Sequence, residues 1–310
     1  MLNGIDVVYW INLDRSPDRR SSMNKLFADS DFDSLDVKRF SAIDYKNRDV
    51  LNYFNLKEVG QRNNRPEYAC FLSHLETIRT FANSNYPDDA VALIMEDDAT
   101  LDYKPYWKTS VSKVIKKAPP DWQIIMLGYM FSEGVRIPDL KKFPEYIPNN
   151  NKFVSAISYL IRKSTAKNFI NKIYKNAQYR LNPNATSHHA DVYLFNNLKT
   201  YAYKYPFFTY KTENDSYLHP DDLDNHKRCK LTISKILYRI DYSADSADNY
   251  SEGFIDRIST NTITNAKLIL ILMLILIFFI VVFLVFYMNI TIFSNSDIFT
   301  YTKIKMKQYK

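Results

Sequence analysis

Short apolar segments recur along the first 210 residues, and each ends at polar or charged residues. Predominantly apolar runs occupy residues 7–13, 122–127 and 153–161, and residues 91–95 are apolar without interruption. Runs of this length without a polar face are typical of strands covered on both sides. Residues 38–43 are a further strand candidate, and the aromatic-rich stretch 201–210 predicts a last strand. The pattern therefore predicts a central β-sheet buried between other elements.

Amphipathic segments separate these predicted strands. Residues 66–83 predict a helix, because Leu72, Leu75 and Ile78 recur at helical spacing and would face the core. Ser73 and His74 lie off this apolar stripe. Helices that alternate with strands predict an α/β fold with a mostly parallel sheet.

Helix boundaries are predicted from capping residues. Pro17 suits the first turn of a helix with Ser16 as its N-cap, and Ser164 is placed to cap another helix. Residues 102–117 are expected to be helical, whereas 131–152 are expected to form a long loop. Gly128, at the end of a predicted strand, would let a ligand or a backbone approach closely.

One apolar segment near the C-terminus differs from all the others. Residues 268–288 are 21 uncharged and almost wholly apolar positions, long enough to cross a hydrocarbon core as a helix. We therefore expect a globular domain over 1–240, a juxtamembrane linker over 241–266, a transmembrane helix over 267–288 and a basic tail over 289–310.

Two features of the sequence favour opposite membrane orientations for this predicted anchor. Four lysines in the last eight residues favour a cytoplasmic C-terminus, which would place the domain outside or in a lumen. Against this, the N-terminus lacks the basic and apolar regions of a signal peptide. We favour a tail anchor with the domain in the cytosol.

Composition and charge narrow the function classes. The formal net charge is +7, but lysine and arginine are scattered along the chain, so a nucleic-acid partner is not expected. The two cysteines, Cys70 and Cys229, form neither a disulfide framework nor a metal-ligand spacing, and Cys70 is expected to pack as a small apolar residue. The absence of GxGxxG and GxxxxGK[ST] motifs removes Rossmann dinucleotide and P-loop sites.

Candidate chemistry begins where the run at 91–95 ends in Glu96, Asp97 and Asp98. Ligands of parallel α/β sheets gather at the carboxyl ends of strands, and Mg²⁺ or Mn²⁺ prefers oxygen ligands. The three carboxylates could thus hold a divalent cation, although an acidic surface turn would show the same letters.

Other polar residues follow predicted strands in the same way. Arg15 and Arg19 could hold phosphates, and Asn12 or Asp14 could contact a ribose or base, unless this segment is simply a solvated helix start. Ser73 and His74 could face a ligand, although a structural histidine is an alternative. The pair His188 and His189 could bind a metal or lie in a surface turn, and Asp191 is a carboxylate at the edge of an apolar element.

Four stretches, taken together and in order, resemble glycosyltransferase family 25. They are INLDRSPDRR at 11–20, RFSAID at 39–44, EYACFLSHLETIRTF at 67–81 and ALIMEDDATL at 92–101. That family includes lipopolysaccharide biosynthesis glycosyltransferases and procollagen galactosyltransferases. Residues 66–70, PEYAC, depart from the common GEIGC pattern of the family, which puts the local backbone geometry in doubt.

The resemblance implies a GT-A-type α/β/α sandwich that uses a UDP-sugar donor and Mn²⁺ or Mg²⁺. By their match to family motifs, Asp98 and Glu96 would bind the metal, and Glu96 and Asp97 would also contact the nucleotide-sugar donor. The donor would be contacted by residues of the N-terminal turn and the SHL motif: Asn12, Asp14, Arg15, Arg19, Ser73 and His74. His219 is a candidate third metal ligand by its position near the end of the domain.

These features predict a metal-dependent transferase that moves galactose or glucose from a UDP-sugar to a saccharide or hydroxylated protein. Inverting transfer requires a base for the acceptor hydroxyl, and Asp191 is the candidate. One alternative is a catalytically inactive, membrane-tethered relative that binds a sugar or nucleotide. Another is a metal-dependent phosphohydrolase that uses the same carboxylates without an acceptor.

Overall fold

The computed structural model describes residues 1–47, 49–56, 63–132, 143–150, 152–182, 187–212 and 223–244. The chain divides into two compact units, Met1–Ala244 and Asp245–Lys310, and all described residues belong to the first. Within that described part, no helix combines the length and apolarity needed to cross a membrane. The predicted linker, transmembrane helix and tail, with the exception of residues 241–244, lie outside the described residues, as does His219.

The first unit is built on a seven-stranded sheet in the order β2-β1-β3-β7-β5-β10-β6. Its strands are β1 (Val7–Asn12), β2 (Asp36–Ser41), β3 (Val91–Glu96), β5 (Ile124–Phe131), β6 (Tyr146–Pro148), β7 (Phe153–Arg162) and β10 (Thr200–Tyr203). The pairings give β1, β2, β3, β5 and β10 one direction, whereas β6 and β7 run the opposite way. The sheet is therefore mixed and mostly parallel.

Strand β7 is inserted antiparallel between β3 and β5, which the strand pattern alone did not predict. A parallel connection needs a long crossover that is usually helical. The described residues between β5 and β7 contain the short strand β6 and no helix. The chain therefore returns beside β5 in the opposite direction.

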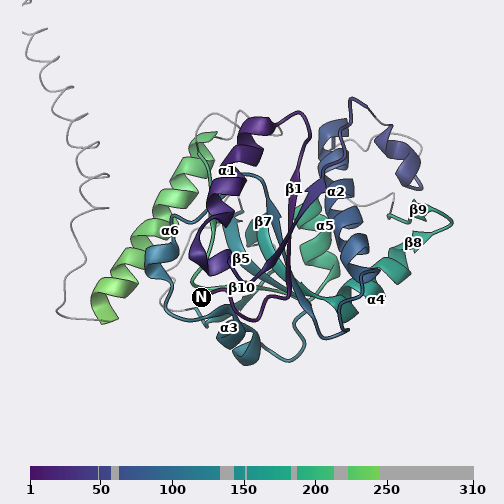
Figure 1. Ribbon diagram of the computed structural model, residues 1–310. Helices are drawn as coiled ribbons and strands as arrows, with labels where there is room; N and C mark the ends of the chain where they lie inside the picture. The colour runs from purple at the N-terminus through teal and green to yellow at the C-terminus, as the bar shows by residue number, and fades with distance from the viewer. Residues whose placement is uncertain are drawn as a thin grey trace, which may run out of the picture. The chain divides into compact units, whose positions relative to one another are not determined.

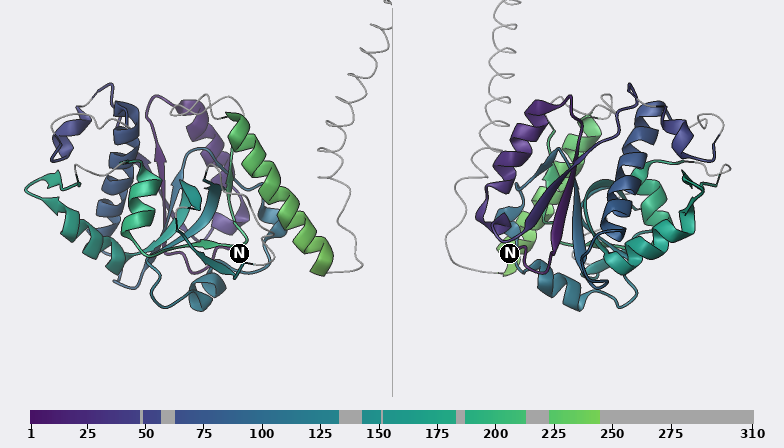
Figure 2. Two further views of the ribbon diagram at one scale, coloured as in Figure 1. Left: turned by 180° about the vertical axis from the view of Figure 1, so that it is seen from behind. Right: turned by 45° about the vertical axis from the view of Figure 1, so that its right-hand side comes forward.

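Helices cover both faces of this sheet. They are α1 (Pro17–Phe27), α2 (Arg65–Ala82), α3 (Val111–Lys117), α4 (Lys163–Ile173), α5 (Ala190–Asn197) and α6 (Leu223–Ala244). In Figures 1 and 2, α2, α4 and α5 lie on one face of the sheet, and α1 and α6 lie on the other. This layering confirms the predicted α/β/α sandwich.

Short elements complete the unit. They are the 3-10 helices η1 (Ser30–Phe32), η2 (Val50–Tyr53) and η3 (Lys104–Tyr106), and the strand pairs β4 (Ala99–Thr100) with β11 (Thr209–Tyr210) and β8 (Tyr174–Lys175) with β9 (Gln178–Tyr179). The segment predicted as one helix over 102–117 contains η3 and α3 instead, and the predicted loop over 131–152 contains β6. A strand of three residues is too short to show a period in the sequence.

One of the two predicted helix caps is corrected by the structure. Ser16 is the N-cap residue of α1 as predicted, although its side chain makes no capping hydrogen bond. Ser164 lies inside the first turn of α4, because β7 runs directly into that helix and Arg162 is its N-cap residue. The backbone N–H groups of Lys163 and Ser164 donate to Ala90 O and Asp88 O, at 2.8 and 3.0 Å. These carbonyls satisfy the helix start without a side-chain cap.

Gly128 was predicted to allow the close approach of either a ligand or a backbone, and its surroundings in the structure decide between the two. A Cβ atom there would lie 2.6 Å from both Ile157 Cγ2 and Ser158 Oγ, and 3.0 Å from Phe208 O. The close neighbours are thus protein atoms of β7 and of the segment before β11. Glycine is required at this point for packing of the sheet.

Candidate active site

A cleft of about 790 Å³ opens at the edge of the sheet where the parallel strands end. Strands β1, β2, β3 and β5 deliver their carboxyl ends to this edge, and the antiparallel β7 begins there. The first half of α2, the start of α5, β11 and the start of α6 complete the walls. This is the position at which open α/β sheets bind ligands.

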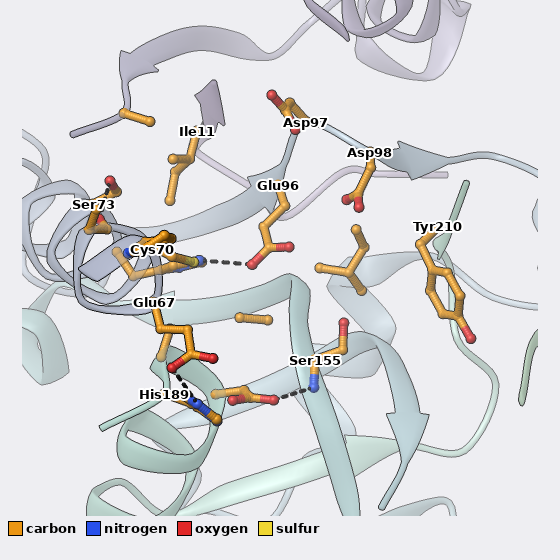
Figure 3. Close-up of a pocket in the computed structure, with 18 of the residues that line it drawn as sticks. Ile11, Glu67, Cys70, Ser73, Glu96, Asp97, Asp98, Ser155, His189 and Tyr210 are labelled. Atoms are coloured by element: carbon orange, nitrogen blue, oxygen red, sulfur yellow. Dashed lines mark hydrogen bonds and ion pairs between the residues drawn. The ribbon is translucent and has the colours of Figure 1, made fainter. Parts of the chain in front are cut away.

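The three consecutive carboxylates at the end of β3 do not share one environment. Asp97 points away from the other two in Figure 3. Its two oxygens accept hydrogen bonds from Asn12 Nδ2 and Arg19 Nη1, each at 2.7 Å. Asp97 is therefore held in an ion pair between β3 and the N-terminal segment, while Glu96 and Asp98 turn toward a common space.

Asp98 carries the least satisfied carboxylate of this group. Its Oδ1 atom is shielded from solvent and has no hydrogen-bond partner within the described part of the chain. Burial, followed by the neighbouring Glu96 charge, raises the pKa of Asp98 to about 7, although Arg19 opposes the shift. A bound divalent cation would offset both the desolvation of the Asp98 carboxylate and its repulsion by Glu96. This pair of carboxylates therefore fits such an ion.

His74 connects Glu96 to the interior of the protein. His74 Nε2 lies 3.1 Å from Glu96 Oε1, and His74 Nδ1 lies 3.1 Å from the Tyr159 hydroxyl. Burial, followed by the Glu96 charge, raises the pKa of Tyr159 far above its usual value, so the phenol keeps its proton. Tyr159 can thus donate to Nδ1 while Nε2–H donates to Glu96.

Ser73 also lines the cleft, but its hydroxyl is committed to the backbone. Ser73 Oγ donates to Ala69 O at 2.7 Å and accepts from the backbone N–H of Ile43 at 2.9 Å. Ser73 and His74 are both fully buried, and Ser73 ties α2 to the segment after β2. Both residues predicted from the SHL stretch therefore lie at the cleft wall.

The predicted residues of the N-terminal turn separate into two groups. Arg15 and Arg19 line the cleft. Asn12 and Asp14 do not: Asn12 is buried and accepts from Arg39 at 3.0 Å, and Asp14 is exposed and pairs with Arg39. In this structure Asn12 holds Asp97 in place, so its amide is not directed at the cleft.

Asp44, which was not singled out from the sequence, lies beside Arg15. Arg15 Nε donates to its carboxylate at 2.7 Å, and the backbone N–H of Lys46 donates at 3.0 Å. Burial would raise the pKa of Asp44, but these two hydrogen bonds outweigh it, and the pKa is lowered. Arg15 is thereby oriented along the wall that carries Arg19.

Asp191 lies on the other side of the cleft, in the first turn of α5. Its oxygens accept from the backbone N–H groups of Ser155 at 2.7 Å and Val192 at 2.8 Å. Ser155 has a φ of 79°, a conformation that is uncommon for a residue with a side chain. The backbone thus holds the Asp191 carboxylate in a fixed orientation at the cleft wall.

The two histidines before α5 do not act as a pair. His188 is buried, with Nδ1 3.0 Å from the Tyr68 hydroxyl and Nε2 3.0 Å from Asn182 O, and burial lowers its pKa. It is therefore neither part of a surface turn nor available to a shared metal with His189. His189 faces the cleft, where its Nε2 lies 3.1 Å from Glu67 Oε2.

Several cleft residues escaped prediction from the sequence. Glu67 and Cys70 precede His74 on α2, and Tyr210, Asn225 and His226 reach the cleft from β11 and α6. Cys70 packs against the hydrophobic core, as expected, and its partly buried side chain also lines the cleft. The spacing of Cys70 and His74, four residues apart on a helix, is the signal that could have placed them on one face.

Comparison with known proteins agrees with this geometry. Residues 5–182 match the family model described as glycosyltransferase family 25 (LPS biosynthesis protein). A glycosyltransferase 25 family member of Aedes aegypti is 31% identical over 140 residues, which are 40% of this chain and 21% of that protein. Procollagen galactosyltransferase 2 of Mus musculus is 29% identical over 138 residues, with the same coverage of 40% and 21%.

The aligned regions thus span about a fifth of the length of these curated relatives. The family model, in contrast, covers more than half of the 310 residues, including strands β1 to β9 and the carboxylates at the end of β3. The resemblance seen in the sequence motifs is confirmed, and the chain belongs to glycosyltransferase family 25.

Proposed function

We propose that this protein transfers galactose or glucose from a UDP-sugar, with Mn²⁺ or Mg²⁺, to a saccharide or a hydroxylated protein, with inversion at the sugar. Family membership already implies a glycosyltransferase with donor and acceptor substrates. The choice of donor is supported by the name of the mouse and human relatives, procollagen galactosyltransferase 2. The saccharide acceptor is supported by the family description as an LPS biosynthesis protein.

The observation that carries this proposal is the shielded Oδ1 of Asp98, which has no hydrogen-bond partner among the described residues, with Glu96 turned toward the same space. Oxygen donors of this kind suit a hard divalent ion that keeps open positions for phosphate oxygens. Asp98 and Glu96 would hold the ion, and Asp97 would stay in its ion pair with Arg19. When bound, the ion would supply Lewis-acid stabilisation of the diphosphate leaving group.

The basic wall of the cleft suits the diphosphate of the donor. Arg15 and Arg19 both line the cleft on the side of β1, and each is oriented by a carboxylate, Asp44 and Asp97 respectively. Guanidinium groups fixed in this way would bind phosphate oxygens with little loss of side-chain entropy. They would also offset the charge that develops on the leaving group.

Asp191, across the cleft, is our candidate base. Each oxygen of its carboxylate accepts one backbone hydrogen bond, and a carboxylate oxygen has a second acceptor position. The carboxylate would take the proton of the acceptor hydroxyl, whose oxygen forms the new bond to the anomeric carbon. The bond from that carbon to the β-phosphate oxygen breaks, and its electron pair leaves with UDP.

The test measures UDP release by the full chain with UDP-galactose or UDP-glucose and Mn²⁺, with and without a chelator. Asp98→Asn should lower metal-dependent release at least about 100-fold, because a charged metal ligand is lost. The matched control is Asp88→Asn, which makes the same change in an exposed turn at the opposite end of β3. It should leave release unchanged.

Other outcomes would point to the alternatives. A folded chain that binds UDP but releases none from either donor would be an inactive, nucleotide-binding relative. Release of sugar phosphate, rather than UDP with free hexose, would indicate cleavage of the pyrophosphate by a phosphohydrolase. Equal loss of activity in Asp88→Asn and Asp98→Asn would remove the assignment of Asp98.

We also propose that the protein is attached to a membrane by residues 267–288, with the transferase domain on the cytosolic side. This proposal is supported by the uncharged apolar segment 268–288, which is long enough to cross a bilayer as a helix. A cytosolic domain would meet nucleotide sugars at their site of synthesis.

A further inference from the structure

We propose that the cleft contains a second cation position, which takes Zn²⁺ or a similar thiol-binding metal through Cys70 Sγ, His74 Nε2 and Glu96. Candidate ligand atoms of these three residues all lie within 4.8 Å of one another. A tetrahedral zinc site with bonds of 2.0–2.3 Å has its donor atoms roughly 3.3–3.8 Å apart. Shifts of about 1 Å at the side-chain ends would therefore close the site.

Rigid elements bring the three ligands together. Cys70 and His74 are four residues apart on α2, so they lie on one face of the helix, and Glu96 ends β3 beside them. His74 Nε2 and Glu96 Oε1 are already 3.1 Å apart. Because all three residues line the cleft, a water molecule can reach the fourth position of a tetrahedral ion.

The outer shell of such a site is also in place. A metal-bound histidine donates its other ring N–H to a neighbouring acceptor, which fixes the ring. His74 Nδ1 lies 3.1 Å from the hydroxyl oxygen of Tyr159, which is fully buried. On metal binding, Nδ1–H would donate to this oxygen and Nε2 would be free to coordinate.

The chemistry of the ligands separates this position from the one at Asp98. Thiolate and imidazole favour Zn²⁺, whereas Mg²⁺ and Mn²⁺ favour oxygen ligands. The charges of the Cys70 thiolate and Glu96 would neutralise a divalent ion. Glu96 is a ligand in both positions, so bound Zn²⁺ would take Glu96 away from the Mg²⁺ or Mn²⁺ ion at Asp98. Zinc is therefore expected to inhibit sugar transfer, and this expectation rests on the proposed function.

The test uses Co²⁺ as a spectroscopic substitute for Zn²⁺ on the full chain without any donor. Co²⁺ should produce a thiolate-to-cobalt charge-transfer band that Zn²⁺ displaces. Cys70→Ser should remove the band, whereas Cys229→Ser should retain it, because Cys229 is buried on α6 and does not line the cleft. Tyr159→Phe should weaken Zn²⁺ binding about 10-fold through loss of the outer hydrogen bond.

Two results would overturn the proposal. One is the absence of a thiolate band in the unaltered chain, which requires no variant to fold. The other is a band that survives Cys70→Ser and disappears in Cys229→Ser. Asp98→Asn separates this inference from the proposed function, because it should lose metal-dependent UDP release and keep the cobalt band. A chain that releases no UDP but shows the band would refute only the proposed function.

Discussion

Single residues at the end of β3 differ because of what lies next to each one. Glu96, Asp97 and Asp98 are indistinguishable as a run of acidic letters, yet Asp97 is saturated by Asn12 and Arg19. Asp98 Oδ1 has no hydrogen-bond partner among the described residues. The middle carboxylate is therefore a structural link, and the outer two are the ones available to a ligand.

This division predicts that Asp97→Asn destabilises the fold. The new amide N–H₂ would face a donor, either Asn12 Nδ2 or Arg19 Nη1, and the buried ion pair would lose its negative partner. We expect the free energy of unfolding to fall by about 2–4 kcal/mol. Urea denaturation measures it, with the exposed Asp88→Asn as control. A loss equal to that of the control would show that Asp97 is not a structural link.

The sequence predicted that the carboxylates lie at a strand end, because the apolar run stops there. It could not predict which carboxylate faces the cleft, because Asn12 and Arg19 are 85 and 78 residues away in the chain. For the same reason Asn12 was predicted to contact a ligand, whereas in the structure its side-chain amide donates a hydrogen bond to Asp97. Contacts of this range depend on the pairing of β1 with β3.

For the helices, the sequence pattern predicted where α1 and α2 lie better than it predicted which side chains cap them. α1 begins at Pro17 as expected, and α2 covers the amphipathic stretch that was expected to be helical. The effective cap of α2 is Asn64, which shares a capping box with Glu67, whereas the serines chosen as caps of α1 and α4 make none. Several residues suit a cap by type, and only the local backbone decides which one is used.

The capping box gives a prediction at this scale. Asn64 Oδ1 accepts from the backbone N–H of Glu67 at 2.9 Å, and Glu67 Oε2 accepts from that of Asn64 at 2.8 Å. Asn64→Ala should cost about 1 kcal/mol of unfolding free energy and speed hydrogen exchange in the first turn of α2. Ser16→Ala is the matched control, because Ser16 makes no capping hydrogen bond. Equal costs for both variants would contradict the assignment of the box.

For the whole molecule, alternation of strands and helices predicted the layered α/β architecture, but not the antiparallel β7 at its centre. That insertion matters for function, because the start of β7 places Ser155 against Asp191. The cleft therefore combines segments from along most of the first unit. Their residue types are visible in the sequence, whereas their convergence follows from strand order, which periodicity does not encode.

The last prediction concerns membrane attachment of the full chain. Each arginine at the centre of a membrane-spanning helix makes the free energy of insertion less favourable by about 2.5–3.5 kcal/mol. The double variant Ile277→Arg and Ile280→Arg, within residues 268–288, should therefore release the protein from membranes into the soluble fraction after carbonate extraction. The double variant Ile277→Leu and Ile280→Leu keeps the apolar character and should stay attached.

Orientation is measured on the same membranes, sealed as vesicles with the cytosolic face outward. Added protease should digest the transferase domain of the unaltered chain, because a tail-anchored domain remains on the side where it was made. A domain that is protected until detergent is added would place it in the lumen, as the four C-terminal lysines favour. The nucleotide-sugar donor would then have to be supplied within that compartment.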